Sequence, residues 1–338
     1  MINYVYQLIA PRTITIKYKN VEPCSERVII RPEYLSICHA DQRYYKGERD
    51  AAVLKKKLPM ALIHEAMGKV VYDPTGNFKV GEKVIMIPNI PGTPVEGVYS
   101  NYLRDSKFSS SGHDGFMREF VDLPPDRVVS CEGVKPTHAA IAEFISVAFH
   151  AVDRFERAVQ SGINRIGVWG DGGLGYLVSL VLKYKFPKAK ICVIGLDDIK
   201  LSRFTHADET YNSTALPADF HVDHAFECCG GSGCYYAGNQ IIDVIEPQGA
   251  VMLMGVSEKE VAYNTRMVLE RGLTLIGCSR SDRCDFENVV EFLRSKNMSQ
   301  RIERIISDVV EVKSIGDIYK AFDIDLTTPF KTVIKWDI

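Results

Sequence analysis

The sequence lacks any apolar run of the roughly 18 residues that a membrane helix needs. Its longest candidate, residues 138–152, is interrupted by Glu143 and His150. The first residues, MINYVYQLIAP, also lack the basic segment and the apolar core of a secretory signal peptide. We therefore expect a cytoplasmic protein that has no membrane partner.

An excess of charge of one sign is also absent. The 338 residues include 41 Lys and Arg against 43 Asp and Glu, which leaves a formal net charge of −2. Such a chain has no electrostatic footprint for nucleic acid, although it is compatible with a small basic pocket for a phosphorylated metabolite. Hydrophobic residues make up 46% and charged residues 25%, which excludes disordered and fibrous classes. At about 150 residues per domain, the length suggests about two domains.

A second closely spaced pair of cysteines, internal repeats and low-complexity tracts are missing as well. The nine cysteines are an odd number and are scattered along the chain, apart from the neighbours Cys228 and Cys229 with Cys234 nearby. In a reducing compartment we expect most of them to be buried thiols, and any exception to be a ligand or a reactive group.

The hydrophobic periodicity changes along the chain and predicts an α/β protein. Up to about residue 130, short β-rich runs are separated by turn residues, which predicts an all-β, barrel-like unit. Helical spacing over residues 136–160 predicts one long helix. Strands and helices then alternate, which is typical of a doubly wound parallel sheet, and two helices and a strand (KTVIKW) close the chain. We expect one domain from residues 1–145 and 283–338, interrupted by a second from residues 146–282.

The strongest local motif, WGDGGLGY, predicts a dinucleotide site. It follows the strand RIGVW, begins a helix and fits G-x-G-x-x-G. Glycine allows the tight turn, the approach of backbone to a pyrophosphate and the close packing of helix on strand. The cofactor-binding residues expected here are Gly170, Asp171, Gly172, Gly173, Leu174 and Gly175.

The end of the next strand favours NADP(H). NAD-specific folds place an acidic residue at this position for the ribose 2′-hydroxyl, whereas the strand KICVIG ends at Gly195. Lys200 and Arg203 follow within a short turn and suit a 2′-phosphate. Two alternatives stay open. If the strand ends about two residues later than we expect, Asp197 or Asp198 supplies the acidic group. The two cations are also typical of the solvated face of a helix.

Three separate segments contain residue types that suit zinc. They are ICHAD with Cys38, LIHEAMGKVV with His64 and Glu65, and AAIAEFISVAFH with Glu143. A thiolate, an imidazole and a carboxylate suit this ion, and three protein ligands would leave a fourth position for water or substrate. Taken singly, each residue is also consistent with an ordinary core or surface position.

Four motifs in this order resemble the medium-chain dehydrogenase/reductase superfamily of zinc alcohol and polyol dehydrogenases. They are C-x-x-D at 38–41, H-E-x-x-G-x-V at 64–70, G-E-K-V at 81–84 and the glycine motif, and the resemblance extends over essentially the whole chain. It implies a GroES-like β-rich catalytic domain with an inserted Rossmann domain. It also implies Cys38, His64 and Glu143 as ligands of one catalytic zinc, with Glu65 beside the metal and able to exchange with water.

Two departures from that superfamily matter. Residues 88–115 contain none of the four cysteines that hold a structural zinc in many members, so we expect no structural zinc. Ala40 stands where many alcohol dehydrogenases have a Ser or Thr that passes the alcohol proton outward. Metal-bound water, Glu65 or a group near Arg43 would have to replace that hydroxyl.

A closer resemblance is carried by the segments LSICHADQRYYKG, LPMALIHEAMG, SSGHDGFMREFV, GVWGDGGLGY, FECCGG and LERGLTLIGCSRS. They are similar to the ribulose-5-phosphate reductases, which use NADPH to make ribitol 5-phosphate for CDP-ribitol, a precursor of bacterial wall teichoic acids and some capsules. This implies zinc-dependent reduction of D-ribulose 5-phosphate beside a ribitol-5-phosphate cytidylyltransferase. Two alternatives remain: a polyol dehydrogenase with an unphosphorylated substrate, or a dinucleotide-binding relative that has lost catalysis.

The remaining expected sites concern the substrate, the nicotinamide and the dimer. A sugar phosphate needs cations or hydrogen-bond donors at its phosphate end. The candidates are Arg43, Tyr44 and Arg49, with His113 as a second choice. Each of them is equally consistent with an ordinary surface or packed residue. By analogy with the superfamily, the nicotinamide and pyrophosphate are expected to contact Gly255, Val256, Ser279 and Arg280. The same analogy implies a homodimer joined through the edge strands AVMLMGV and LTLIGCS.

Overall fold

The computed structural model describes residues 1–159 and 162–338 and divides the chain into two compact units. The first unit comprises Met1–Ser146 and Ser281–Ile338, and the second comprises Val147–Arg280. The chain therefore leaves the first unit once and returns to it. Among the described residues, no helix combines the length and the apolar composition that crossing a bilayer requires.

This division assigns three residues differently from the expected domains. Ser146, Ser281 and Asp282 all belong to the first unit. The Oγ atoms of the two serines lie 2.7 Å apart and are buried, and the Asp282 side chain accepts the N–H of Arg283 at the start of α9 (Arg283–Arg294). The two serines are 135 positions apart, so local patterns do not reveal their contact.

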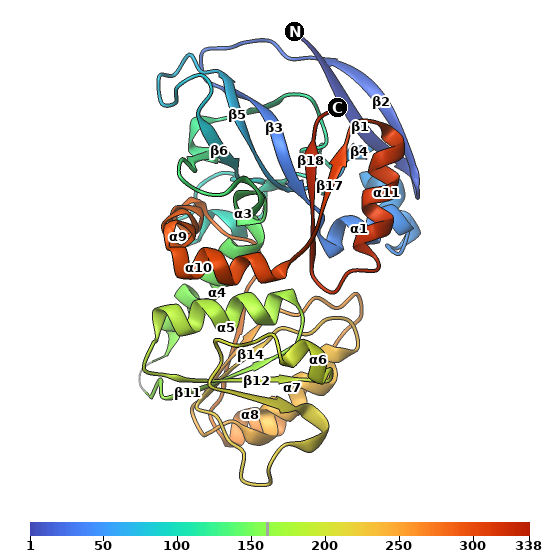
Figure 1. The fold of residues 1–338 in the computed structure, drawn as a ribbon. Coiled ribbons are helices and arrows are strands. Elements are labelled where there is room, and N and C mark those ends of the chain that lie inside the picture. Colours follow the sequence, from blue (N-terminus) through green and yellow to red (C-terminus); the bar gives the residue numbers. More distant parts are fainter. Residues whose placement is uncertain (160–161) are drawn as a thin grey trace. The chain divides into compact units, whose positions relative to one another are not determined.

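The main sheet of the first unit contains strands from both ends of the chain. Its order is β10-β6-β5-β3-β18-β17, with β9 paired to β3. The bounds are β3 (Val28–Ser36), β5 (Glu65–Tyr72), β6 (Lys83–Met86), β9 (Val121–Leu123), β10 (Val128–Ser130), β17 (Ile306–Val312) and β18 (Lys331–Trp336). Because β18 runs antiparallel beside β3, the last strand of the chain lies inside the amino-terminal sheet (Figure 1).

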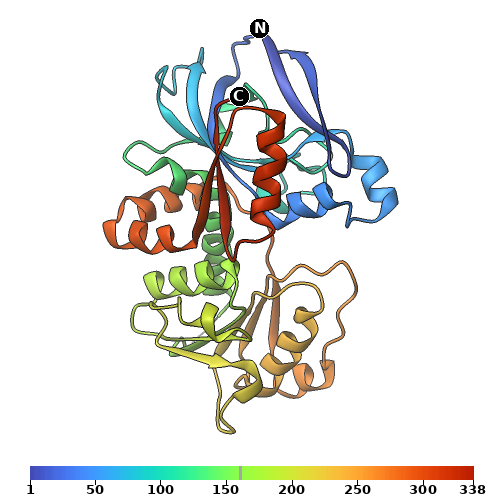
Figure 2. The same cartoon turned by 45° about the vertical axis from the view of Figure 1, so that its right-hand side comes forward.

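A smaller sheet and short helices complete the core of this unit. Strand β1 (Ile2–Ala10) pairs with β2 (Thr13–Asn20) and β4 (Met60–Ala61), and β7 (Asn89–Ile90) pairs with β8 (Lys107–Phe108). Helix α11 (Ile315–Asp325) packs along β17 and β18 (Figure 2). Its Phe322 stacks at 4.5 Å on Tyr45 of α1 (His39–Lys46), and both rings are buried. Burial of one such ring contributes about 2 kcal/mol to stability.

Some elements of this unit were not expected from the sequence. The β-rich interpretation misses α1, α2 (Ala51–Lys57), α10 (Lys296–Ile302) and β17. The prediction of one helix over residues 136–160 is wrong, because the chain forms α3 (Pro136–Ala140) and α4 (Ala142–Ala158) with a break at Ile141. There the amide donates to the carbonyl three residues back, at His138, while the apolar periodicity continues unbroken. The break places Glu143 in the first turn of α4.

The second unit is built on one parallel sheet. In the part of the chain that the structure describes, its order is β13-β12-β11-β14-β15-β16. The bounds are β11 (Arg165–Trp169), β12 (Lys190–Gly195), β13 (Glu209–Asn212), β14 (His224–Glu227), β15 (Ala250–Leu253) and β16 (Thr274–Gly277). Helices α5 (Gly173–Lys185), α6 (Asp198–Leu201), α7 (Gly233–Val244) and α8 (Thr265–Glu270) connect them. This is the doubly wound order, whose ligand crevice lies at the carboxyl ends of the strands where the order reverses.

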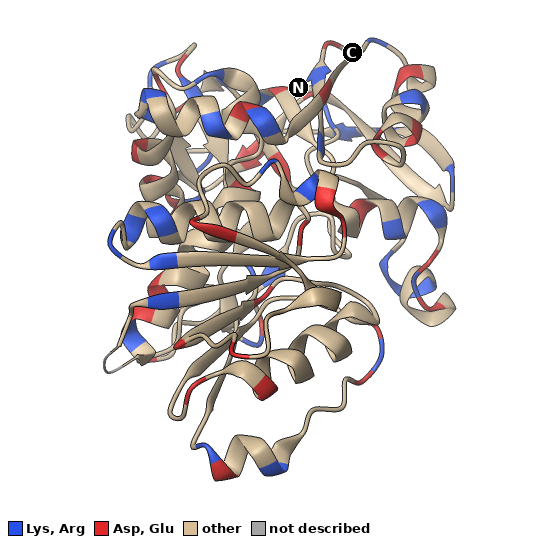
Figure 3. Cartoon of the chain, turned by 60° about the horizontal axis from the view of Figure 1, so that its bottom comes forward, with Lys and Arg blue, Asp and Glu red and all other residues tan. Residues whose placement is uncertain are grey.

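Figure 3 shows Lys and Arg interspersed with Asp and Glu along the ribbon of the described residues. This mixing agrees with the near-neutral composition of the chain.

Candidate functional site

The register of β3 and β5 brings two distant motifs together. Ser36 of β3 pairs with Glu65 of β5, so Cys38 after one strand faces His64 before the other. The Cys38 sulfur, a His64 ring nitrogen and a Glu65 carboxylate oxygen all lie within 4.8 Å of one another. No other group of three such side chains was found in the described ranges. Thiolate, imidazole and carboxylate are the donors that zinc prefers, so these residues fit the metal implied by the motifs.

Asp41 organises this group from behind. Its carboxylate is completely buried, and its Oδ2 accepts the Cys38 N–H at 3.2 Å and lies 3.7 Å from His64 Nδ1. Its Oδ1 accepts the N–H of Ile63 at 2.9 Å and the hydroxyl of Ser110 at 2.6 Å. A carboxylate that orients a ligand in this way is typical of metal sites. Asp41 is the last residue of the C-x-x-D motif, but the motif alone does not indicate this role.

The backbone before His64 is strained. Ile63 has a φ of 67°, a region that β-branched residues rarely occupy. It is held there by the hydrogen bond to Asp41 and by the Phe116 N–H, which donates to the Ile63 carbonyl at 2.7 Å. Such conformations persist where the surroundings impose them, and they cluster at functional sites. His64, which follows directly, has a ring nitrogen within 4.8 Å of the Cys38 sulfur.

Lys331 is the main residue that sequence reasoning missed. Its Nζ lies 2.5 Å from Glu65 Oε1, donates to the Ile37 carbonyl at 2.8 Å and lies 4.6 Å from the centroid of the Phe144 ring. Lys331 is 8% exposed and Glu65 is fully buried, so this ion pair is shielded from water. The sequence feature that could have indicated Lys331 is a lysine at the start of the apolar strand KTVIKW. The two residues are 266 positions apart, and only the sheet order brings them together.

The buried ion pair leaves one carboxylate oxygen of Glu65 uncommitted. Glu65 Oε2 is buried and has no hydrogen-bond partner among the residues that the structure describes. Burial raises the pKa of Glu65, while the positive charges of Lys331 and His64 oppose this rise. An orphaned buried oxygen beside a thiol and an imidazole is a suitable donor for a cation.

Glu143 faces the same group from the first turn of α4. It is buried, and burial raises its pKa to about 7, against the opposing influence of His64. Burial alone would lower the pKa of His64, but Asp41, Cys38 and Glu143 raise it well above its usual value. Glu143 is not part of the group of donor atoms within 4.8 Å in the described chain. Its assignment as a third ligand therefore stays a prediction.

The candidate phosphate-binding residues lie on and after α1. Arg43 is half-buried, Tyr44 is buried, and the Arg49 guanidinium lies 4.8 Å from the centroid of the Tyr44 ring. Burial lowers the pKa of His39, and the positive charges of Lys331 and Arg43 add to this effect. His113 is exposed in the turn after β8.

The stretch 88–115, which contains no cysteine, is organised by polar and aromatic contacts. Asp105 Oδ2 accepts the N–H and the hydroxyl of Thr93, both at 2.9 Å. Tyr99 and Tyr102, at the 3-10 turn Ser100–Tyr102, meet edge to face with their ring centroids 6.2 Å apart. The Asp105 contacts join two parts of this stretch that are 12 positions apart.

The glycine motif forms the turn between β11 and α5. Gly170 has a φ of 135°, and a Cβ there would lie 2.9 Å from the Cys228 carbonyl oxygen. A Cβ on Gly175 would lie 1.9 Å from the Gly170 carbonyl oxygen, so helix and turn pack too closely for a side chain. A Cβ on Gly172 would meet nothing within 4 Å, so this glycine borders open space at the start of α5. A helix start with open space beside it suits a pyrophosphate.

The other expected cofactor residues gather at the same edge of the sheet. Strand β12 ends at Gly195, as the sequence predicts, and α6 places the half-buried Lys200 directly after it. The Gly255 amide donates to Glu227 Oε2 at 3.0 Å, and Val256 is exposed. The last two residues of this set follow β16. Ser279 is exposed, and Arg280 has a φ of 61°.

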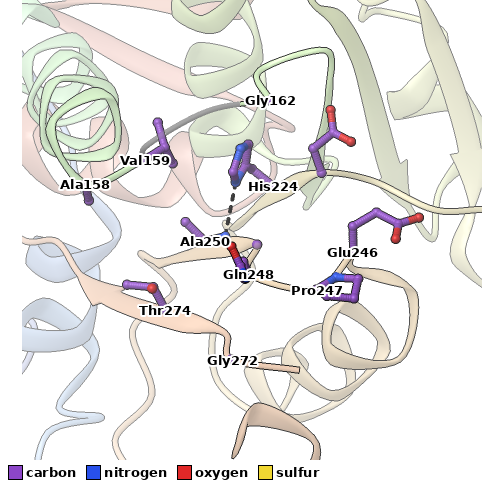
Figure 4. A pocket seen from close by; sticks show the side chains of 12 residues that line it. Ala158, Val159, Gly162, His224, Glu246, Pro247, Gln248, Ala250, Gly272 and Thr274 are labelled. Atoms are coloured by element: carbon purple, nitrogen blue, oxygen red, sulfur yellow. Dashed lines mark hydrogen bonds between the residues drawn. The ribbon is translucent and has the colours of Figure 1, made fainter. Parts of the chain in front are cut away.

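A cavity of about 380 Å³ lies at the opposite edge of the parallel sheet. It is lined by residues that begin β14, β15 and β16, and His224 Nδ1 accepts the Ala250 N–H there at 3.1 Å (Figure 4). Asp223 and Glu246 add carboxylates to its wall. Cofactors of doubly wound folds bind at the carboxyl ends of the strands, so this acidic cavity at the amino ends is not the expected site.

Comparisons with known proteins agree with the fold. Residues 25–133 match the family model of the alcohol dehydrogenase GroES-like domain. The chain is 48% identical over 340 residues to a ribulose-5-phosphate reductase of Streptococcus pneumoniae, covering 100% of this chain and 98% of that protein. It is 47% identical to the ribulose-5-phosphate reductase of Bacillus spizizenii, with both chains covered completely.

Solved structures support the same classification. The crystal structure of Staphylococcus aureus TarJ in complex with NADPH aligns with a TM-score of 0.89 and 43% identity, and it covers both chains completely. L-idonate 5-dehydrogenase from Escherichia coli aligns with a TM-score of 0.87 at 18% identity, which shows the shared fold alone. A GroES-like unit interrupted by a doubly wound unit, with a Cys-His-Glu group in the first, defines a medium-chain dehydrogenase/reductase. Within that superfamily, the chain belongs to the ribulose-5-phosphate reductases.

Proposed function

We propose that this protein reduces the C2 carbonyl of D-ribulose 5-phosphate to D-ribitol 5-phosphate with NADPH. The observation that carries the proposal is the full-length similarity to ribulose-5-phosphate reductases, at 46–48% identity in four relatives. The group of Cys38, His64 and Glu65 supports it, because this donor set fits the metal of the superfamily. The product would supply CDP-ribitol for teichoic acid or capsule synthesis in the cytoplasm.

The residues proposed to hold one catalytic zinc are Cys38, His64 and Glu143, with Glu65 beside the metal. When bound, the ion supplies Lewis-acid stabilisation of the negative charge that develops on the carbonyl oxygen as hydride reaches C2. Asp41 holds His64 in place from behind. The hydroxyl that relays the proton in many relatives is replaced by Ala40, and Glu65, fixed by Lys331 through one oxygen, is our candidate for that role.

The direct test is an assay of NADPH oxidation with D-ribulose 5-phosphate and with D-ribulose. We expect kcat/KM to be at least about 100-fold higher for the phosphorylated sugar, since a buried charged contact is worth roughly 3 kcal/mol. A strong chelator should abolish the activity, and Zn²⁺ but not Mg²⁺ should restore it. Equal rates with the two sugars would favour a polyol dehydrogenase. A protein that contains zinc but oxidises no NADPH would favour an inactive relative.

The phosphate end of the substrate is proposed to contact Arg43, with Tyr44, Arg49 and His113 as further candidates. Arg43→Ala should raise the KM for D-ribulose 5-phosphate about tenfold while the KM for NADPH stays the same. Arg12→Ala is the matched control, because Arg12 is an exposed arginine that lies over the Tyr45 ring. An equal rise in both KM values for Arg43→Ala would count against the assignment.

A homodimer is proposed to form through the edge of the parallel sheet. Strand β16 is an edge strand of the described sheet, and Leu275 on it and Leu269 just before it are exposed. Exposed edge strands are normally covered or charged, which supports a second copy of the chain as the partner. Light scattering should give about twice the mass of one chain, and Leu275→Lys should reduce it to that of a monomer. A wild-type protein that remains a monomer at micromolar concentration would contradict this.

Association with a cytidylyltransferase is proposed from family resemblance alone.

A further inference from the structure

Asn89 is a buried asparagine whose side chain makes no hydrogen bond within the described chain. It lies on β7, near the start of the stretch 88–115. Asn89 is 1% exposed, and neither its Nδ2 nor its Oδ1 has a hydrogen-bond partner among the residues that the structure describes. Burying a carboxamide without hydrogen bonds is unfavourable, so such a group calls for a functional explanation.

A second asparagine of the same unit shows the usual arrangement. Asn3 on β1 is also 1% exposed, but its Nδ2 donates to the Phe120 carbonyl and its Oδ1 accepts the Phe120 N–H, both at 2.9 Å. The Asn3 carboxamide therefore serves the fold by joining two segments of the chain. The Asn89 carboxamide makes no comparable bond with any described residue.

The pairing of β7 with β8 places the Asn89 side chain on the face that meets His64. Asn89 stands directly opposite Phe108 in this antiparallel pair. Directly opposite residues place their side chains on the same face of a sheet. The centroid of the Phe108 ring lies 5.2 Å from that of the His64 ring. The carboxamide therefore lies on the side of these strands that meets the donor group of Cys38, His64 and Glu65.

Two further hydrogen bonds fix these strands relative to the donor group. The Ser109 N–H donates to the Pro88 carbonyl at 3.0 Å, which ties β8 to the residue before Asn89. The Ser110 hydroxyl donates to Oδ1 of Asp41, the carboxylate behind the donor group, at 2.6 Å. The Asn89 carboxamide is thus held in place by the fold, as binding groups of specific sites are.

We infer that the Asn89 carboxamide binds hydroxyls of the sugar chain beside the reacting carbonyl and thereby selects polyhydroxylated ketones. Hydroxyls both donate and accept, so adjacent ones can satisfy Oδ1 and Nδ2 together. A site built to bond a hydroxyl rejects an analogue that lacks it, because its buried polar atoms would stay unpaired. The inference rests on the proposed reduction of D-ribulose 5-phosphate, whose hydroxyls are on C1, C3 and C4.

The test compares D-ribulose 5-phosphate with 4-oxopentyl phosphate, which keeps the carbonyl and the phosphate at the same spacing and lacks these hydroxyls. Asn89→Leu replaces the carboxamide by an apolar group of similar size. We expect it to lower kcat/KM for the sugar phosphate about 30-fold, because hydroxyls are left unpaired in a buried site. The value for the analogue should change less than about threefold. If the analogue is bound but not reduced, its inhibition constant takes the place of kcat/KM.

Asn3→Leu is the matched control, since it makes the same substitution at an equally buried position of the same unit. It should unfold at a lower urea concentration than wild type, because the Phe120 backbone groups lose their partners, and it should leave the ratio of the two kcat/KM values unchanged. Asn89→Leu should unfold at no lower urea concentration than wild type, because it removes an unpaired buried group. If Asn89→Leu does not fold, the smaller Asn89→Ala provides the same ratio.

The inference is wrong if Asn89→Leu lowers both kcat/KM values equally or leaves both at the wild-type value. A loss of stability like that of Asn3→Leu, with an unchanged ratio, would assign the carboxamide to the fold instead. A wild type that reduces D-ribulose as well as its phosphate, together with a loss of this activity in Asn89→Leu, would support the inference and contradict the proposed function. A wild type that reduces neither sugar would overturn both.

Discussion

Replacing Lys331 by methionine is expected to lower the free energy of unfolding by about 3–5 kcal/mol, because removing one partner of a buried ion pair leaves the other charge uncompensated. The burial of the Lys331–Glu65 pair explains why so large a loss of stability is expected. Glu65 is fully buried, its Oε1 lies 2.5 Å from Lys331 Nζ, and its Oε2 has no hydrogen-bond partner in the described chain. The Ile37 carbonyl would also lose its donor.

Urea unfolding of the purified variants measures this effect, and the same strand provides the control. Lys335 also lies on β18 and pairs with Glu311 at 2.8 Å, but both side chains are exposed. Lys335→Met should therefore unfold close to the wild-type urea concentration, since exposed ion pairs contribute little. The double variant Lys331→Met, Glu65→Gln should regain much of the lost stability, because it removes both charges. A Lys331→Met protein as stable as Lys335→Met would show that the pair is unimportant for folding.

Replacing Cys38 by serine is expected to remove most of the bound zinc and to reduce kcat/KM about a thousandfold or more, because the metal supplies several kcal/mol of charge stabilisation. Zinc content is measured by atomic spectroscopy before and after dialysis against a weak chelator. Wild type should retain one zinc per chain, as expected for a stretch 88–115 without cysteine. Cys24→Ser, which changes an exposed thiol, should retain both zinc and activity. A Cys38→Ser protein with full zinc and activity would refute the site.

The same measurement decides between the two carboxylates as the third ligand. Glu65 lies in the donor group but is paired with Lys331, whereas Glu143 faces that group from α4. On our proposal, Glu143→Gln loses zinc and Glu65→Gln keeps it, because Lys331 already compensates the charge of Glu65. The reverse result would make Glu65 the ligand.

Local patterns predicted the doubly wound sheet of the second unit, although they did not indicate the short elements β13, α6 and α8. Strands and helices alternate with clear changes of period, and the glycine motif stands between β11 and α5 where the sequence predicts it. The break at Ile141 was missed because apolar spacing continues through it and only the backbone hydrogen bonds change. Helix α1 was missed because it begins within a β-rich region, after Cys38, and is short.

For the candidate site, the sequence by itself determined the chemical types: a thiol, an imidazole and two carboxylates in family motifs, and a glycine turn for a dinucleotide. The tertiary structure decided which charges act together. It paired Glu65 with a lysine 266 residues away and placed Asp41 behind His64. Short-range patterns reflect burial and backbone geometry, which are local, whereas charge compensation depends on which strands become neighbours, and sheet order alone settles that.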